Sequence, residues 1–494
     1  MNKKSIRLFT ILLISAFTHL WNPVGFPDLF YDEGIYMRRA MHTMQELNPQ
    51  ESYLYDHPYF GQIFLASVLK MINYPSSLAR DEIDSMVRLL YEVPRILMGI
   101  LAVIDTFLLF KIAEKRYDMN NAIIASLIFA VMPLTWLLRR ILLDSIMLPF
   151  ILGSILLSLY YKDSSHKILL LILSGTLLGI AIYTKITAAI MIPLIAYLIY
   201  TGLDGNRIKH VMHIMLWLSP VILIPLHWPL HSIMLNQFDL WVSGVTWQAS
   251  RGSNGLVSSL GSVVLLDPII LILGLGGLVY TVYTKDHLIV LWIIPFFIFF
   301  SIAYNQYFHW ILVFPALSIS SARMLVELYN RINSFTLKKF ARACIYMVLS
   351  SAMIFTTMLI TTDVTSAQFK MLAFMARHLD NDSNDVTVLT NPAYVWILRH
   401  VLEYENIYDY RHVLFYNINT DKIILIADKH LKYDNDGDIL QALYDRSVVW
   451  KTFEIEDRYS NITIYPYTNL YFNLDGSRIE VRFIEDLYRY NNLR

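Results

Sequence analysis

The sequence predicts an α-helical polytopic membrane protein with a small soluble α/β domain at its C-terminal end. Two observations support this prediction. Hydrophobic residues make up 56% of the 494-residue chain and charged residues only 16%. The apolar residues are gathered in blocks of about twenty, the length at which a helix crosses ~30 Å of hydrocarbon. Beyond Thr361 these blocks stop, and the composition becomes that of a water-soluble domain.

About eleven apolar segments are predicted to span the membrane. The first is expected to be retained, because it is long and no small-residue cleavage site follows it. To within a few residues the segments are 6–23, 88–110, 120–138, 141–161, 168–183, 186–201, 210–228, 262–283, 288–303, 310–328 and 342–361. A transmembrane domain is therefore expected over residues 1–361 and an α/β domain over residues 362–494.

Basic residues in the short loops predict the orientation. Lys3 and Lys4 precede the first segment, and further Lys and Arg residues recur in the loops of the same parity. Short loops rich in these residues face the cytoplasm. The N-terminus is therefore expected inside the cell and the C-terminal domain outside, as in a multi-pass protein of a prokaryotic plasma membrane.

The residues after Thr361 alternate between strand and helix patterns. β-branched and apolar runs predict strands over 385–392, 422–428, 448–456 and 461–468, and helices are predicted over 393–405 and 438–445. This alternation is typical of a small α/β domain.

Composition argues against several functional classes. The formal net charge is zero, which gives no support for a nucleic-acid partner. Cys344 is the only cysteine, so a thiolate metal cluster cannot form within one chain. No glycine-rich phosphate loop is present. No cofactor is expected and no metal site is assigned, although a divalent metal is left open.

Asp32 and Glu33 stand side by side shortly after the first apolar segment, on the predicted outer face. One interpretation is that they cap a helix at the membrane surface. The other is catalytic: two adjacent acids in a poorly solvated cleft do not ionise independently, so one can serve as a general base while its neighbour supports it.

Arg139 and Arg140, followed by Asp144, lie on the outer turn between the third and fourth segments. Arginine is unexpected there, because short outer loops are poor in basic residues. A phosphate or an anionic lipid headgroup would compensate the charge, since a guanidinium holds phosphate oxygens with two donors. An internal ion pair between Arg140 and Asp144, four residues apart on one helical face, is the alternative.

Lys185 interrupts an apolar stretch at the outer end of a helix, with no acidic residue near it in sequence. It either extends to the interface or completes a phosphate site with the two arginines. His57 in the first outer loop, and His309 in the polar turn 304–309, are weaker candidates. With no second histidine at metal-ligand spacing, His57 is expected to position substrate.

Four stretches resemble motifs of the protein O-mannosyltransferase family of glycosyltransferases, which use lipid-linked sugars and have the GT-C membrane fold. YDEGIYMRRA at 31–40 is similar to that family's D-E-x-x-Y motif, and HPYFGQ at 57–62 to its H-P-P-x-G. RRILLDSIML at 139–148 is similar to S-R-x-I-L-L-D, and LLGIAIYTKITAAIMIP at 177–193 to G-L-A-x-x-T-K. Tyr59 replaces the second proline of H-P-P, and the C-terminal domain resembles no carbohydrate-binding repeat of that family.

The resemblance implies roles for individual residues. Asp32 would be the catalytic base and Glu33 its neighbour. Arg140 and Lys185 would face the phosphate of a polyprenyl-phosphate sugar, and His57 would belong to the acceptor or donor cleft. Arg139 and Asp144 are expected to bind substrate as well.

A lipid-linked donor carries its own leaving group, so the reaction needs a base for an acceptor hydroxyl and cations for the departing phosphate. The expected activity is the transfer of a hexose such as mannose to a protein hydroxyl on the outer face. A lipid or glycan acceptor, as in the aminoarabinose transferases, is the alternative acceptor class. A transporter and a non-catalytic sugar-binding protein are the alternatives from other classes. The domain after Thr361 is expected to bind acceptor without taking part in the chemical step.

Overall fold

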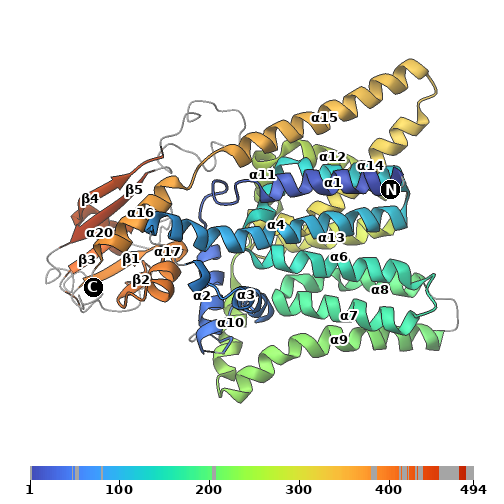
Figure 1. Cartoon of the computed structure of the whole chain (residues 1–494). Coiled ribbons are helices and arrows are strands. Elements are labelled where there is room, and N and C mark those ends of the chain that lie inside the picture. Colours follow the sequence, from blue (N-terminus) through green and yellow to red (C-terminus); the bar gives the residue numbers. More distant parts are fainter. Residues whose placement is uncertain are drawn as a thin grey trace. The chain divides into compact units, whose positions relative to one another are not determined.

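The computed structural model describes residues 3–46, 48–50, 55–78, 82–202, 207–379, 386–410, 413, 420, 422–428, 431, 438–455 and 478–484. Over these residues the chain is mostly helical, with one small sheet near its C-terminal end (Figure 1). The strand predicted over 461–468 lies outside the described residues.

The first sixteen α-helices come before the sheet, with short 3₁₀ turns between some of them. They are α1 Lys3–Leu20, α2 Tyr31–Glu46, α3 Phe60–Met71, α4 Ile83–Arg116, α5 Met119–Val131, α6 Leu143–Tyr161, α7 Lys167–Thr184, α8 Ile192–Thr201, α9 Arg207–Met234, α10 Phe238–Ser250, α11 Leu256–Leu266, α12 Pro268–Tyr283, α13 His287–Ile302, α14 Phe314–Arg331, α15 Phe335–Thr361 and α16 Ser366–His378. The 3₁₀ turns include η2 Pro133–Arg139, η3 Ile186–Met191 and η4 Tyr307–Leu312.

Among the described residues, five helices are long and apolar enough to cross a membrane. They are Ile83–Arg116, Leu143–Tyr161, Lys167–Thr184, Arg207–Met234 and the stretch Phe335–His378, which comprises α15 and α16. The pair α5 and η2, bent by 69°, raises the number to six if it forms one span. The chain is thus a multi-pass membrane protein. The predicted count of eleven is not reached by these criteria, because several predicted segments form helices of ten to seventeen residues.

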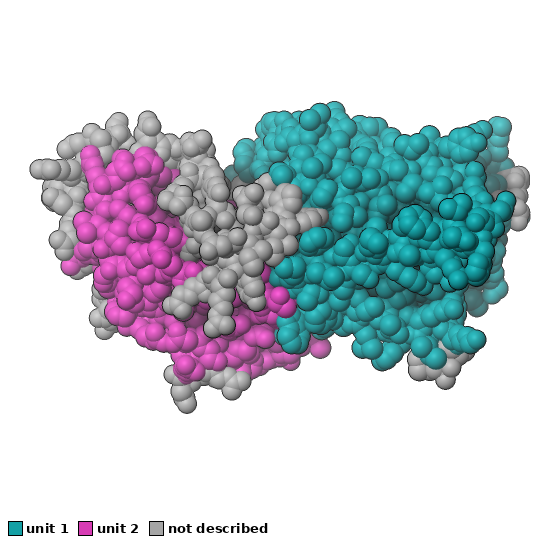
Figure 2. Space-filling model, turned by 90° about the horizontal axis from the view of Figure 1, so that it is seen from above, with its two compact units in different colours: residues 1–21, 50–61, 96–359 teal, residues 22–49, 62–95, 360–494 magenta. Residues whose placement is uncertain are grey.

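The chain divides into two compact units, coloured separately in Figure 2. Unit 1 comprises Met1–Trp21, Gln50–Gly61 and Ile96–Leu359. Unit 2 comprises Asn22–Pro49, Gln62–Arg95 and Ile360–Arg494. This division differs from the predicted domains 1–361 and 362–494, because much of the chain between the first two predicted segments, α2 included, is in the same unit as the C-terminal sheet.

Small residues allow the helices of unit 1 to pack closely. Helices α6, α7 and α9 lie side by side (Figure 1). A Cβ added at Gly175 of α7 would overlap the backbone oxygen of Trp217 on α9, so only glycine permits this approach. The hydroxyls of Ser154 and Ser174 are 3.0 Å apart between α6 and α7. Such hydroxyl pairs satisfy polar groups that hydrocarbon cannot.

The sheet of unit 2 has five strands in the order β2-β1-β3-β5-β4. They are β1 Val386–Thr390, β2 Ile407–Asp409, β3 Lys422–Ala427, β4 Val448–Phe453 and β5 Ile479–Ile484. Strand β1 pairs in parallel with β2 and β3, whereas β5 runs antiparallel to β3 and β4. The carboxyl ends of β1, β2 and β3 therefore lie along one edge, where ligand and contact residues of α/β sheets gather.

The sequence prediction for this domain is confirmed for strands β1, β3 and β4. The predicted helix 393–405 corresponds to α17 Pro392–Trp396 and the π-helix η5 Ile397–Val401, and the predicted helix 438–445 to α20 Asp438–Arg446. Strands β2 and β5 were not predicted. Helices α16 and α20 pack against the sheet (Figure 1).

Candidate functional site

Asp32 and Glu33 occupy the first turn of helix α2, in unit 2. Asp32 is partly exposed and Glu33 is fully buried. The carboxylate of Glu33 accepts the backbone N–H of Phe30 at 3.0 Å, which satisfies one of the unpaired donors at the start of the helix. The helix-capping interpretation is therefore confirmed for Glu33.

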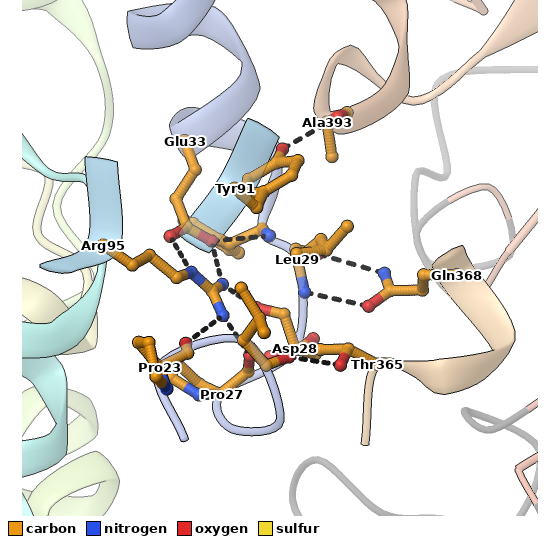
Figure 3. Close-up of polar contacts among 12 residues, drawn as sticks. Pro23, Pro27, Asp28, Leu29, Glu33, Tyr91, Arg95, Thr365, Gln368 and Ala393 are labelled. Atoms are coloured by element: carbon orange, nitrogen blue, oxygen red, sulfur yellow. Dashed lines mark hydrogen bonds and ion pairs between the residues drawn. The ribbon is translucent and has the colours of Figure 1, made fainter. Parts of the chain in front are cut away.

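Arg95 of α4 holds the Glu33 carboxylate with both sides of its guanidinium (Figure 3). Its Nε donates to Oε1 at 3.0 Å and its Nη2 donates to Oε2 at 2.7 Å, and neither side chain is exposed. The other N–H groups donate to the backbone oxygens of Pro23 at 3.1 Å, Pro27 at 2.7 Å and Asp28 at 2.8 Å. All five donors of this arginine are thus satisfied.

This ion pair separates the two acids by environment. Glu33 is a buried anion whose charge is balanced by Arg95, and it fixes the segment that leads into α2. Asp32, the residue before Glu33, is the acid that remains accessible to solvent. Arg95 was missed at the sequence level. Its signal was present, because a charged residue within the predicted segment 88–110 requires a buried partner.

The cations of the sequence prediction all belong to unit 1. Arg139 ends η2 and Arg140 follows it, and both side chains are fully buried. Arg139 Nη2 donates to the backbone oxygen of Trp21. The guanidinium carbon of Arg140 lies 5.1 Å from the ring centre of Trp136, a cation–π contact.

Asp144 pairs with Lys185, which corrects the predicted alternative of an Arg140–Asp144 pair. Lys185 follows the last residue of α7, and its Nζ lies 2.7 Å from Oδ2 of Asp144 on α6. Lys185 is 5% exposed and Asp144 is not exposed. Arg140 and Asp144 are four positions apart, but an extended residue, Leu142, stands between η2 and α6, so helical spacing does not apply.

His309, on η4, lies against Lys185, with its Nε2 3.1 Å from the lysine Nζ. The backbone N–H of Gln306 donates to Nδ1 of His309 at 2.9 Å. His309 lies outside the candidate spans, and its pKa is well below the usual value because of burial first and then the charges of Lys185, His57 and Arg251. The ring is therefore neutral near pH 7, with a proton on one nitrogen and a lone pair on the other.

The Lys185 ammonium thus contacts both the Asp144 carboxylate and a neutral imidazole beside η4. The ammonium also lies 5.1 Å from the ring centre of Phe308. Trp136, which contacts Arg140, lies 6.3 Å from Tyr307 on the same turn. The turn η4 thus links the Arg140 and Lys185 sides of this cation group, defined here as Arg139, Arg140 and Lys185 with the neutral His309 beside them.

His57 lies in unit 1, where its charge is close enough to lower the pKa of His309. Tyr59, which replaces a proline of the H-P-P motif, is buried, and its hydroxyl lies 3.2 Å from Nδ1 of His231 on α9. The structure thus brings His57, Asp144, Lys185 and His309, a weaker candidate of the sequence, into one region. Among the described residues no group of three or more His, Cys, Asp or Glu side chains has the arrangement of a metal site.

One family model matches part of the chain. It is described as dolichyl-phosphate-mannose-protein mannosyltransferase and matches residues 91–229, the stretch that contains Arg139, Arg140, Asp144 and Lys185. No curated protein sequence matches the chain.

Solved structures are similar over most of the chain. ArnT from Cupriavidus metallidurans bound to undecaprenyl phosphate is similar with a TM-score of 0.58 and 12% identity, over 97% of each chain. The apo Archaeoglobus fulgidus oligosaccharyltransferase gives a TM-score of 0.60 and 10% identity, over 90% of this chain and 71% of its own. The oligosaccharyltransferase AglB of the same organism, in complex with an inhibitory peptide and a dolichol-phosphate, gives 0.56 and 11%, over 89% and 71%. These likenesses show that the chain has the GT-C fold.

Proposed function

We propose that the chain is a membrane glycosyltransferase that moves a sugar from a polyprenyl-phosphate donor to a hydroxyl group of an acceptor. The GT-C fold supports this proposal, and two structures of that fold hold undecaprenyl phosphate and dolichol-phosphate. The sugar is proposed to be a hexose such as mannose, and the acceptor a protein on the outer face of the membrane. A lipid or glycan acceptor is the alternative outcome of the acceptor assay.

The observation that carries the proposal is the buried cation group of unit 1. Arg139 and Arg140 are fully buried, and Lys185 is 5% exposed beside Nε2 of His309. Buried cations interact strongly with an anionic ligand, because little solvent screens their charge. A phosphate diester supplies charge and several acceptor oxygens, and a guanidinium fork matches its geometry.

The proposed reaction needs no bound cofactor. Asp32 accepts the proton of the acceptor hydroxyl, the acceptor oxygen bonds to the anomeric carbon, and the bond between that carbon and the phosphate oxygen breaks. The polyprenyl phosphate leaves with the bonding electrons, and the cation group stabilises its charge. The proton passes from Asp32 to solvent. Glu33 serves the reaction indirectly, through the Arg95 pair that fixes the start of α2.

The test is the substitution Asp32→Asn in the purified full-length protein. The amide keeps the shape of the side chain but cannot take a proton at neutral pH, so transfer is expected to fall by about 10²–10⁴-fold. Transfer is measured with dolichyl- or undecaprenyl-phosphate mannose and protein, lipid and glycan acceptors, by mass spectrometry of the products.

Asp363→Asn is the matched control. Asp363 lies in the same unit and accepts the backbone N–H groups of Thr365 and Ser366, a capping role that asparagine also fills. It is expected to transfer sugar at the wild-type rate. If Asp32→Asn is as active as this control, Asp32 is not the base. If wild-type protein transfers sugar to none of the acceptors, the proposed function is wrong.

A further inference from the structure

Helix α2 is attached to the carboxyl edge of the C-terminal sheet at three places around Asp32. The first is Tyr31, the residue before Asp32. Its ring packs against the apolar core of the sheet, with its centre 6.4 Å from that of Tyr410. Its hydroxyl donates to Oδ2 of Asp409 at 2.7 Å. Asp409 is the last residue of β2, so this bond ties the first turn of α2 to the end of a parallel strand.

The second attachment is Gly34, two residues after Asp32. A Cβ added there would overlap the backbone oxygen of Pro392, the first residue of α17. Helix α17 begins directly after β1, and Asn391 between them caps it by accepting the N–H of Ala393 at 2.9 Å. The backbone of α2 thus lies in direct contact with the segment that leaves β1.

The third attachment holds the chain before α2. Gln368 of α16 accepts the N–H of Leu29 at 2.9 Å, and its amide donates to the oxygen of Leu29 at 3.4 Å (Figure 3). The same amide donates to the hydroxyl of Tyr394 at 2.8 Å, and Tyr394 donates to Asp428 at 3.3 Å. Asp428 follows β3 directly and also accepts from Asn391 at 3.0 Å. A buried polar network therefore runs from the ends of β1 and β3 to Leu29.

We propose that the carboxyl edge of this sheet positions Asp32, with Asp409, Gln368 and Pro392 acting as positioning residues through their contacts at residues 31, 29 and 34. The proposal rests on the proposed function for its kinetic consequence. It replaces the expectation that the domain after Thr361 only binds acceptor, because the acid and the sheet belong to one compact unit. A misplacement of about 1 Å at a reacting group costs up to ~10²-fold in rate, so the contacts around residue 32 affect turnover.

The experiment compares Tyr31→Phe, Asp409→Ala, their double variant and the control Tyr444→Phe, all in the full-length protein. Tyr444 matches Tyr31 closely. It is partly buried, packs on the same core, and donates to a carboxylate of the sheet, Glu480, at 3.1 Å. It makes no described contact with α2. Each variant is measured for kcat, for donor KM, and for amide hydrogen exchange over residues 29–36.

Tyr31→Phe and Asp409→Ala are expected to lower kcat by about 5–10-fold, to leave donor KM unchanged, and to speed exchange over 29–36. The double variant is expected to be no slower than Asp409→Ala alone, because that change already removes the bond to Tyr31. Tyr444→Phe is expected to change none of these quantities.

Two results would overturn the proposal. One is a wild-type kcat and exchange rate in both Tyr31→Phe and Asp409→Ala. The other is an equal loss of kcat in Tyr444→Phe, which would indicate a general loss of stability. If wild-type protein transfers no sugar, the proposed function has failed, and exchange alone decides. Faster exchange over 29–36 in Tyr31→Phe than in Tyr444→Phe then supports positioning by the sheet, and equal exchange refutes it.

Discussion

Replacing Arg95 by methionine is expected to destabilise unit 2 strongly. Arg95→Met keeps a long, unbranched side chain but removes all five N–H donors of the guanidinium. Glu33 would be left as a buried carboxylate without its cation, and the backbone oxygens of Pro23, Pro27 and Asp28 would lose their donor.

The magnitude follows from the burial of the pair. Both side chains are 0% exposed, so solvent does not screen the charge that remains. Breaking a buried ion pair from one side costs about 3–5 kcal/mol. Unit 2 falls in the size range where 1 kcal/mol shifts the melting temperature by about 2–4 °C. The midpoint of thermal unfolding is therefore expected to fall by about 10 °C.

The assay measures, by size-exclusion chromatography, the fraction of protein that remains monodisperse after heating in detergent. The control is Arg331→Met, which removes a solvent-exposed pair with Glu327 on α14 and is expected to leave the midpoint unchanged within error. The double variant Glu33→Met with Arg95→Met is expected to melt above Arg95→Met alone, because it removes the uncompensated charge.

Either of two results would refute this reasoning. The first is a midpoint for Arg95→Met within about 2 °C of the wild type, which would mean that Glu33 finds another partner or is protonated at little cost. The second is a double variant no more stable than Arg95→Met, which would place the cost in lost packing and not in the charge of Glu33.

Three further predictions concern the cation group and the orientation. Arg140→Lys and Lys185→Ala are expected to weaken binding of a polyprenyl phosphate by about tenfold or more, measured by titration, because a point charge lacks the guanidinium fork and alanine lacks a donor; unchanged affinity in both would remove the phosphate role. The lowered pKa of His309 means that the unfolded chain binds a proton below about pH 6.5 that the folded chain does not. The contribution of this group to the free energy of unfolding is complete above pH 6.5 and decreases as the pH falls. The melting temperature of His309→Gln is therefore expected to decrease less between pH 6.5 and 5 than that of the wild type, and equal decreases would contradict this. Val448→Cys in a Cys344→Ala background, at a site 72% exposed, is expected to react with an impermeant maleimide in intact cells, and labelling only after lysis would reverse the predicted orientation.

The sequence located most of the charged residues of the candidate site. Arg139, Arg140, Asp144 and Lys185 were found because charge beside apolar segments is costly and therefore carries information. It did not identify their partners. Asp144 pairs with Lys185, a residue on another helix, and not with its neighbour in sequence. His309 was only a weak candidate, because its contact with Lys185 joins residues 124 positions apart in the sequence.

The sequence by itself determined the membrane class and the α/β character of the C-terminal region, because hydrophobic length and strand periodicity are local properties of the chain. It also indicated Asp32 and Glu33 as a pair worth explaining. Only the tertiary structure distinguished them, since Arg95 reaches Glu33 from helix α4 and leaves Asp32 as the accessible acid. The tertiary structure likewise decided that α2 belongs with the sheet, through Tyr31 and Asp409, which are separated by 378 positions. Contacts over such separations depend on how distant segments fold together, which no local pattern encodes.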